Sequence, residues 1–217
     1  MTNATPTTTI QSALDASLST IRAEFPGTPE ALAVVIASGR GKFHGRFEAN
    51  SWKDSSGTHE GSARHEIIMS SESLARTAEE VLTTLLHECA HAVAFATGVK
   101  DTSRGGRYHN DNFATTASAM GCIVEKVEGS KHGYSTTGLN EWAKVRFASE
   151  IDLLAESLVT FRKLPEKKPT KKVNIRVACT CDEGTGLLAV TVPIKWWDKF
   201  GSYALTCSEC GSNFEEV

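Results

Sequence analysis

The stretch TLLHECAHAV, residues 84–93, places two histidines around a glutamate and decides how the rest of the chain is interpreted. His87 and His91 are four residues apart, so on a helix both imidazole rings lie on one face and can bind the same ion. Glu88 is set around the helix from that pair, and it can therefore reach a water molecule on the metal instead of the metal itself. Zinc lowers the pKa of such a water, and a glutamate in this place can take its proton.

The three residues could also have fallen together by chance, but their context favours a site. Thr77 and Glu80 have the spacing of a capping box, which predicts the start of a helix, and Gly98 predicts its end. One half of this predicted helix is apolar, and the two histidines lie just outside that half. The apolar positions are Val81, Leu82, Leu85, Leu86, Cys89 and Val93.

A third ligand is available further along the chain. His109 follows the glycine-rich loop GVKDTSRGGRY and precedes the N-terminus of the next predicted helix. From this position it can fold back towards the histidine pair. Three protein ligands and a water are the arrangement of a catalytic zinc site. We expect the remaining histidines to take no part in metal binding, and two cysteines to be small core residues; these are His44, His59, His65, His132, Cys89 and Cys122.

The pattern along the chain predicts an α+β fold. A Thr-rich start, residues 1–9, is expected to be disordered, and apolar residues then recur every three or four positions from Ile10 to Phe25, as in an amphipathic helix. Three strands are expected to form a small sheet, and after the helix that carries the two histidines come a short helix, one more strand and a long helix stopped by Pro165. The ranges are 31–38, 43–52 and 65–70 for the sheet, and 111–120, 122–127 and 141–164 for the later elements.

Four of the six cysteines fall in the last 45 residues. Cys179 and Cys181 form C-x-C, and Cys207 and Cys210 form C-x-x-C followed by a glycine. Two such pairs separated by enough chain for a hairpin predict a zinc ribbon, with strands in LLAVTVPI and SYALT. A redox C-x-x-C or a disulfide is the alternative, but neither accounts for all four cysteines in a reducing compartment. A segment of this size has too small a hydrophobic core to fold by itself, and a structural metal ion would supply the missing stability.

Charge and hydropathy narrow the choice of partners. The net charge of −3 gives no chain-wide attraction to nucleic acid, and no apolar run is long enough for a signal peptide or a membrane span, so we expect a cytoplasmic protein without a membrane partner. Residues 162–172 hold six basic residues against one acidic, hence +5, whereas residues 173–217 carry −3. This basic segment could contact DNA phosphates, or it could be a solvated linker. Trp196 and Trp197 could stack on a base or pack the ribbon, and we expect one to be packed and the other exposed.

Taken together, the quoted elements resemble the SprT-like family of zinc metalloproteases, which includes Spartan. The resemblance rests on HEIIMSSESL, VLTTLLHECAHAV, YHNDNF and the cysteine-bearing tail, in that order, and it is nearest to bacterial and phage-type members. It implies a minimal zincin-type metalloprotease domain over residues 10–164, a basic linker over 165–172 and a zinc ribbon over 173–217. In that domain His87, His91 and His109 would be the zinc ligands and Glu88 the general base.

The chain departs from the family pattern at two places. The family has glycine after the third histidine where this chain has Asn110, and we expect the asparagine to keep a left-handed turn. Ala90 stands where the family often has cysteine. Neither change touches the zinc chemistry.

Two functions follow from the sequence. The first is a zinc-dependent endopeptidase with one catalytic and one structural zinc, acting on proteins associated with DNA, with Tyr108 and Tyr134 as candidates for stabilising the oxyanion. The alternative is a DNA- or protein-binding module in which both zinc ions are structural. Glu88 favours the enzyme, because a purely structural site has no use for a carboxylate there.

Overall fold

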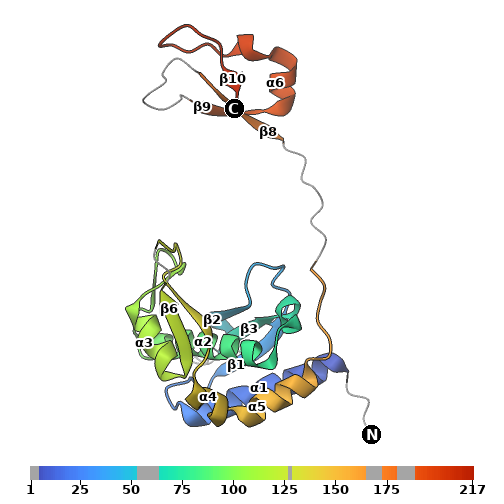
Figure 1. Ribbon diagram of the computed structural model, residues 1–217, viewed down its shortest axis with the longest axis vertical. Coiled ribbons are helices and arrows are strands. Elements are labelled where there is room, and N and C mark those ends of the chain that lie inside the picture. The colour runs from blue at the N-terminus through green and yellow to red at the C-terminus, as the bar shows by residue number, and fades with distance from the viewer. Residues whose placement is uncertain (1–4, 53–63, 127–128, 165–172, 180–188) are drawn as a thin grey trace, which may run out of the picture. The chain divides into compact units, whose positions relative to one another are not determined.

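The computed structural model describes residues 5–52, 64–126, 129–164, 173–179 and 189–217 (Figure 1). The chain divides into two compact units, Met1–Pro165 and Glu166–Val217. Helices and small sheets are mixed along the chain, so the prediction of an α+β protein is confirmed at this level.

The first helix, α1 (Pro6–Glu24), begins earlier than the sequence suggested. Thr5 caps it by accepting a hydrogen bond from the Thr8 amide, and a proline occupies the first helical position, where its missing N–H costs nothing. Residues 6–9 are therefore helical, and the prediction that they are disordered is wrong. The predicted apolar face is confirmed, with Ile10, Leu14, Leu18 and Ile21 buried.

The predicted small sheet has three strands, β1 (Leu32–Ala37), β2 (Gly45–Trp52) and β3 (Arg64–Ser70). Their order is β1-β3-β2, with β1 parallel and β2 antiparallel to the central β3. Strand β2 therefore lies at the edge of the sheet. A 3₁₀ turn, η1 (Ser71–Ala75), follows β3 and leads to the central helix.

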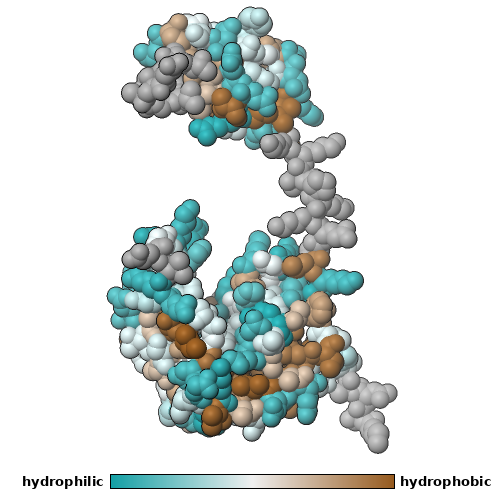
Figure 2. All heavy atoms as spheres, in the orientation of Figure 1, coloured by the Kyte–Doolittle hydropathy of each residue, from teal (hydrophilic) through white to brown (hydrophobic). Residues whose placement is uncertain are grey.

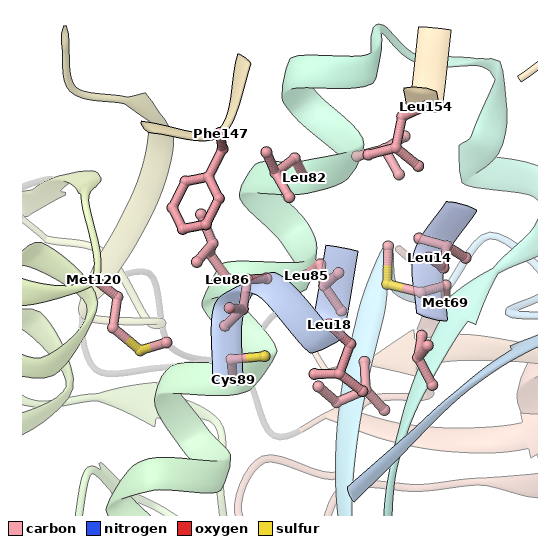
Figure 3. Packing of buried hydrophobic residues seen from close by; sticks show 14 of the residues in the cluster. Leu14, Leu18, Met69, Leu82, Leu85, Leu86, Cys89, Met120, Phe147 and Leu154 are labelled. Atoms are coloured by element: carbon pink, nitrogen blue, oxygen red, sulfur yellow. The ribbon is translucent and has the colours of Figure 1, made fainter. Parts of the chain in front are cut away.

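The central helix, α2 (Ala78–Ala96), carries residues 84–93 and starts at the predicted capping box. Thr77 accepts from the Glu80 amide, while the Glu80 carboxylate accepts from the Thr77 amide. The helix contacts β2 and β3 on one side and α5 on another. Figure 3 shows its leucines meeting side chains of α1, β3 and α5 in one core; labelled there are Leu14, Leu18, Met69, Leu82, Leu85, Leu86, Cys89, Met120, Phe147 and Leu154.

A second layer of short elements covers another face of α2. The hairpin-like pair β4 (Thr102–Ser103) and β5 (Tyr108–His109) leads into α3 (Asp111–Ala119), which is followed by the antiparallel strands β6 (Cys122–Lys126) and β7 (Tyr134–Leu139). Helix α3 and β7 both contact α2. Strand β7, YSTTGL, was not predicted, because it has few large apolar residues.

The predicted long helix is broken in two, α4 (Glu141–Arg146) and α5 (Ala148–Ser157). Phe147 leaves the helical conformation between them, and its fully buried ring packs near Phe25 and Trp142. After Ser157 the chain is not helical. It runs beside η1, where the Arg162 amide donates to the Ser71 carbonyl, so a contact outside the helix replaces the expected helical bonds.

The second unit has a small antiparallel sheet of β8 (Asn174–Ala178), β9 (Ala189–Pro193) and β10 (Glu215–Glu216), in the order β10-β8-β9. Strand β9 lies within the predicted LLAVTVPI. The segment SYALT is not a strand but contains a 3₁₀ turn, η2 (Ser202–Ala204), preceded by an unpredicted helix, α6 (Ile194–Phe200). Both tryptophans of α6 are half-buried, so the expectation that one is exposed is wrong; Trp197 packs on the core of the unit and Trp196 lies against Phe200.

The surface is mostly hydrophilic on the face shown in Figure 2, where hydrophobic patches are small and separate. Among the described residues, no helix has the length and apolar character needed to cross a membrane.

Candidate active site

The three histidines predicted as ligands come together on the first unit. His87 and His91 lie one turn apart on α2, and His109 ends β5, with Asn110 between it and α3. Each residue offers one ligand atom, and these atoms lie within 4.8 Å of one another. The three half-buried rings thus surround one point, as three protein ligands of a single metal ion would.

The Nδ1 atom of each imidazole ring has a hydrogen-bond partner within the protein. Nδ1 of His87 lies 3.0 Å from the Thr136 hydroxyl, and Nδ1 of His91 lies 2.5 Å from the Asp101 carboxylate. His109 uses Nδ1 towards the carbonyl oxygen of Tyr134, at 2.8 Å. Since Nδ1 is held in all three, Nε2 is the nitrogen left for a metal, and such partners fix both the orientation and the tautomer of the ligand. The donor set fits zinc.

The floor of this site is an aromatic ring. Phe113, fully buried on α3, lies 4.2–4.8 Å from the three imidazoles, measured between ring centroids. Burial lowers the pKa of His87 and of His109, and the positive charges that neighbouring imidazoles would carry act in the same direction. A neutral imidazole is the form that binds a metal, so the surroundings favour the state that metal binding requires.

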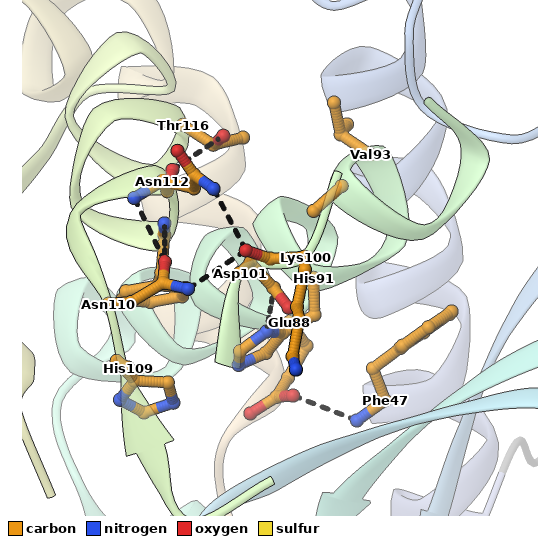
Figure 4. A network of polar contacts seen from close by, with 12 residues as sticks. Phe47, Glu88, His91, Val93, Lys100, Asp101, His109, Asn110, Asn112 and Thr116 are labelled. Carbon is orange, nitrogen blue, oxygen red and sulfur yellow. Dashed lines mark hydrogen bonds and ion pairs between the residues drawn. The ribbon is translucent and has the colours of Figure 1, made fainter. Parts of the chain in front are cut away.

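Asn110 does not adopt the left-handed conformation expected from the sequence. Its backbone is extended, with φ −95°, and it caps α3 by accepting from the amides of Asn112 and Phe113. Its side-chain amide donates to the Lys100 carbonyl (Figure 4), and its backbone amide donates to the Asp101 carbonyl. The asparagine thus ties the segment that carries Asp101 to the start of α3, one residue after His109.

Glu88 points from α2 towards the edge strand β2. Its carboxylate accepts a 2.8 Å hydrogen bond from the Phe47 amide, as Figure 4 shows, and the residue is 6% exposed. Burial raises the pKa of Glu88 to about 7, while the charge of His91 and the Phe47 amide oppose that rise. A carboxyl group so placed can both accept and return a proton near neutral pH.

The site opens into a cleft with two limbs that share Gly45, His87, Glu88 and His109. One limb, which we call the Arg76 limb, has a volume of about 400 Å³ and is bounded by the first turns of α2, by β7 and by the start of β2. The other, the aromatic limb, has a volume of about 480 Å³ and is lined by Phe43, Phe47, Phe95 and Val99 among others. His87 and His109 thus lie where the two limbs meet, while His91 lines the aromatic limb.

A second cluster lies in the C-terminal unit. The sulfur atoms of Cys179, Cys207 and Cys210 lie within 4.8 Å of one another, with 3.4 Å between those of Cys179 and Cys210. Gly211 follows in a left-handed conformation, φ +74°, and the Ser212 amide donates to the Cys210 sulfur, as expected where a turn carries a thiolate ligand. The predicted fourth ligand, Cys181, lies outside the described residues.

Several contributors to the first site could not be recognised in the sequence. Asp101 and Thr136 orient two of the ligands, and Gly45 brings β2 close to Glu88. The aspartate could have drawn attention as a carboxylate near a histidine motif, whereas the threonine carries no signal. Tyr108 and Tyr134, suggested as oxyanion donors, are not among the residues that line either limb.

The remaining histidines and cysteines were expected to lie outside the metal sites, on the surface or in the core. Cys89 and Cys122 are buried core residues, as expected, and burial raises the pKa of both thiols. His65 accepts from the Asn50 amide and takes no part in the three-histidine cluster. His44 is exposed as expected, but it lines the Arg76 limb. His59 lies outside the described residues.

The sequence of residues 31–133, which spans β1 to the start of β7 and includes all three histidines, matches the model of the SprT-like family. This segment belongs to the SprT-like family. No curated protein and no solved structure matches the chain. Family membership suggests a metallopeptidase-like domain, and the two clusters of histidine and cysteine side chains are consistent with zinc.

Proposed function

We propose that the chain is a zinc-dependent endopeptidase whose active site comprises His87, His91, His109 and Glu88. The observation that carries the proposal is the combination of three oriented imidazoles with a buried carboxylate on the next residue, in an open cleft. Zinc, when bound by the three Nε2 atoms, supplies a Lewis acid and a water molecule of lowered pKa.

The roles of the protein groups follow from their positions. Glu88 would take the proton of the attacking water and later give it to the departing amine, and the Phe47 amide holds one of its oxygens in place. Thr136, Asp101 and the Tyr134 carbonyl hold the three rings in the orientation in which they would bind the metal. Among the described residues, no strand pairs with the outer edge of β2, and apart from the Phe47 amide, which Glu88 engages, this edge offers backbone groups to which an extended substrate can pair. The cleft continues on both sides of the histidines, so the interior of a polypeptide fits it better than a chain end does.

The decisive experiment compares the full-length protein with Glu88→Gln, which keeps size and a hydrogen-bond acceptor for the Phe47 amide. We expect the variant to bind zinc as the native chain does and to lose cleavage of β-casein, an unfolded substrate. Zinc content by mass spectrometry and cleavage by gel would be followed on the same samples. Native-level cleavage by Glu88→Gln would exclude this mechanism, and a binding module without catalysis would show no cleavage by either form.

We propose a structural zinc in the C-terminal unit, held by Cys179, Cys207 and Cys210 together with Cys181. Four thiolates leave no open coordination position, so this ion would stabilise the small unit and take no part in hydrolysis.

We further propose that the basic segment 162–172 brings the enzyme to DNA. Its excess of +5 against −3 for the whole chain supports this role. A salt series of DNA affinity tests it, because each phosphate contact steepens the fall of affinity with salt. Binding that is absent at low salt, or that does not depend on salt, would contradict the proposal.

A further inference from the structure

The two limbs of the cleft differ in chemistry. The aromatic limb presents phenylalanine rings and a valine beside Arg46, whose charge is paired with Glu48. The other limb presents the guanidinium of Arg76 and Glu80, together with the hydroxyl-bearing residues Thr83, Thr84 and Thr136. A polypeptide lying through the cleft would therefore meet mainly aromatic surface on one side of the cut bond and the Arg76 guanidinium on the other.

Arg76 is held in place by the structure around it. Its Nε donates to the Ser73 carbonyl at 3.0 Å, one terminal nitrogen donates to the Glu80 carbonyl at 3.4 Å, and the other donates to the Thr84 hydroxyl at 2.9 Å. A guanidinium carries five N–H groups, so these three bonds leave two for a ligand. The half-buried side chain is thus fixed before any ligand arrives, which reduces the entropy lost on binding.

The charge of Arg76 is not matched by a close partner. Among the residues that the structure describes, no carboxylate oxygen lies within 4.0 Å of its nitrogens. Glu80 acts on Arg76 through its charge, but its carboxylate is engaged by the amide and hydroxyl of Thr77 at 2.9 and 2.8 Å. The guanidinium therefore has no direct ionic partner among these residues, and because it lines the cleft, its unused N–H groups can pair with an anion that enters there.

The position of Arg76 relative to Glu88 sets where that anion belongs. Arg76 is bonded to Thr84, which precedes Glu88 by four residues on α2, or roughly 6 Å along the helix axis. An extended peptide advances roughly 3.3 Å per residue. Arg76 is also bonded to the carbonyl of Glu80, which is further from Glu88. For a peptide that runs along this helix, the guanidinium therefore lies about two to three residues from the peptide bond that Glu88 serves.

We propose that Arg76 is a specificity-determining residue that selects an aspartate or glutamate within three residues of the cut bond, on one side only. This inference rests on the proposed endopeptidase function. The carboxylate would pair with the two unused N–H groups of the guanidinium, while the aromatic limb accepts large apolar side chains on the other side of the cut.

The test uses the full-length zinc-loaded protein and maps its cleavage sites in β-casein by mass spectrometry. We expect acidic residues to be enriched on one side of the cuts. A peptide built on the best site, amidated at its C-terminus so that no terminal carboxylate competes, would then be compared with versions that carry glutamine or lysine in place of the acidic residue. The native protein should favour the acidic peptide in kcat/KM by about 10- to 100-fold, the usual effect of a hydrogen bond to a charged group.

Variants separate recognition from support of the fold. Arg76→Gln should lose the preference, Arg76→Glu should prefer lysine, and Arg76→Lys should keep part of the acidic preference. Arg46→Gln is the matched control, because Arg46 lies on the aromatic limb and pairs with Glu48; it should leave the acidic preference intact. Zinc content and urea unfolding would show which variants are folded.

The outcomes distinguish this inference from the function on which it rests. No cleavage of β-casein by the native protein would overturn both. Cleavage without acidic enrichment on one side, or with enrichment that persists in Arg76→Gln, would overturn the role of Arg76 and leave the endopeptidase in place.

Discussion

Gly45 is the point at which the edge strand crosses the active-site helix, and replacing it by alanine is a demanding test of the site. A Cβ atom there would lie 2.6 Å from Cγ2 of Thr84, 2.8 Å from Cγ of Glu88 and 2.9 Å from its Oε1. Carbon atoms in contact settle at about 3.5 Å or more, so β2 and α2 must separate by about 1 Å. The 2.8 Å bond from the Phe47 amide to Glu88 would then be too long to persist.

The expected effect of Gly45→Ala is larger on activity than on folding. Overpacking of this kind costs about 1–3 kcal/mol in the free energy of unfolding, whereas a misplacement of about 1 Å at a catalytic group can lower the rate about 100-fold. Zinc binding should persist, because the three atoms nearest to the added methyl group belong to Thr84 and Glu88 and not to a histidine. Urea unfolding, zinc content and cleavage of β-casein would be measured on one preparation.

Gly138→Ala is the matched control for this change. Gly138 lies on β7, and an added Cβ would meet no atom within 4 Å, so neither stability nor cleavage should fall appreciably. If Gly45→Ala cleaved β-casein and unfolded as the native protein does, the close approach of β2 to Glu88 would have no part in the mechanism, and the reasoning above would be refuted.

Three further predictions concern the metal, acid stability and the division of the chain. Asp101→Asn should weaken zinc binding at the histidine site about 10- to 100-fold in a chelator competition, because His91 loses its charged partner; unchanged affinity would contradict that role. Hydrogen bonds, foremost from Ser38, lower the pKa of the buried Glu72 from 4.5 to about 2. Its ionised form therefore stabilises the fold above about pH 4.5, and this contribution is lost as pH falls towards 2. Glu72→Gln should be less stable than the native chain at pH 7, with the difference in urea unfolding shrinking between pH 4.5 and 2; a constant difference would exclude the linkage. A chain ended after Leu164 should fold, bind one zinc and still cleave β-casein, while binding DNA more weakly than the full chain; loss of folding, by circular dichroism, would show that the two units depend on each other.

The sequence predicted those parts of the fold that depend on neighbours along the chain. The capping box at Thr77, the apolar half of α2 and the pairing of His87 with His91 are all local, and the structure has them as expected. The prediction of one long helix was wrong. Local propensity favours a helix through Phe147, but the ring of Phe147 is buried in the core and the helix is interrupted at this residue.

The orienting groups around the histidines could not be predicted for a related reason. Thr136 meets His87 across 49 residues of sequence, and the Tyr134 carbonyl meets His109 across 25. Neither a threonine in a polar strand nor a backbone carbonyl has a pattern to detect. The role of Asn110 could not be predicted either, because it depends on hydrogen bonds to the carbonyls of Lys100 and Asp101, which only the folded chain brings near.

The strand that orients the metal ligands also forms a wall of the cleft. Thr136 and the Tyr134 carbonyl on β7 hold two of the three rings, Gly133 bridges to the backbone of His109, and Ser135, Thr136 and Thr137 line the Arg76 limb. A metal bound by the three rings would therefore be coupled to the shape of the cleft, because β7 holds two of the ligands and lines the cleft as well. Under the proposed function, zinc binding would stabilise the wall against which a polypeptide lies, so metal affinity and substrate affinity would rise and fall together.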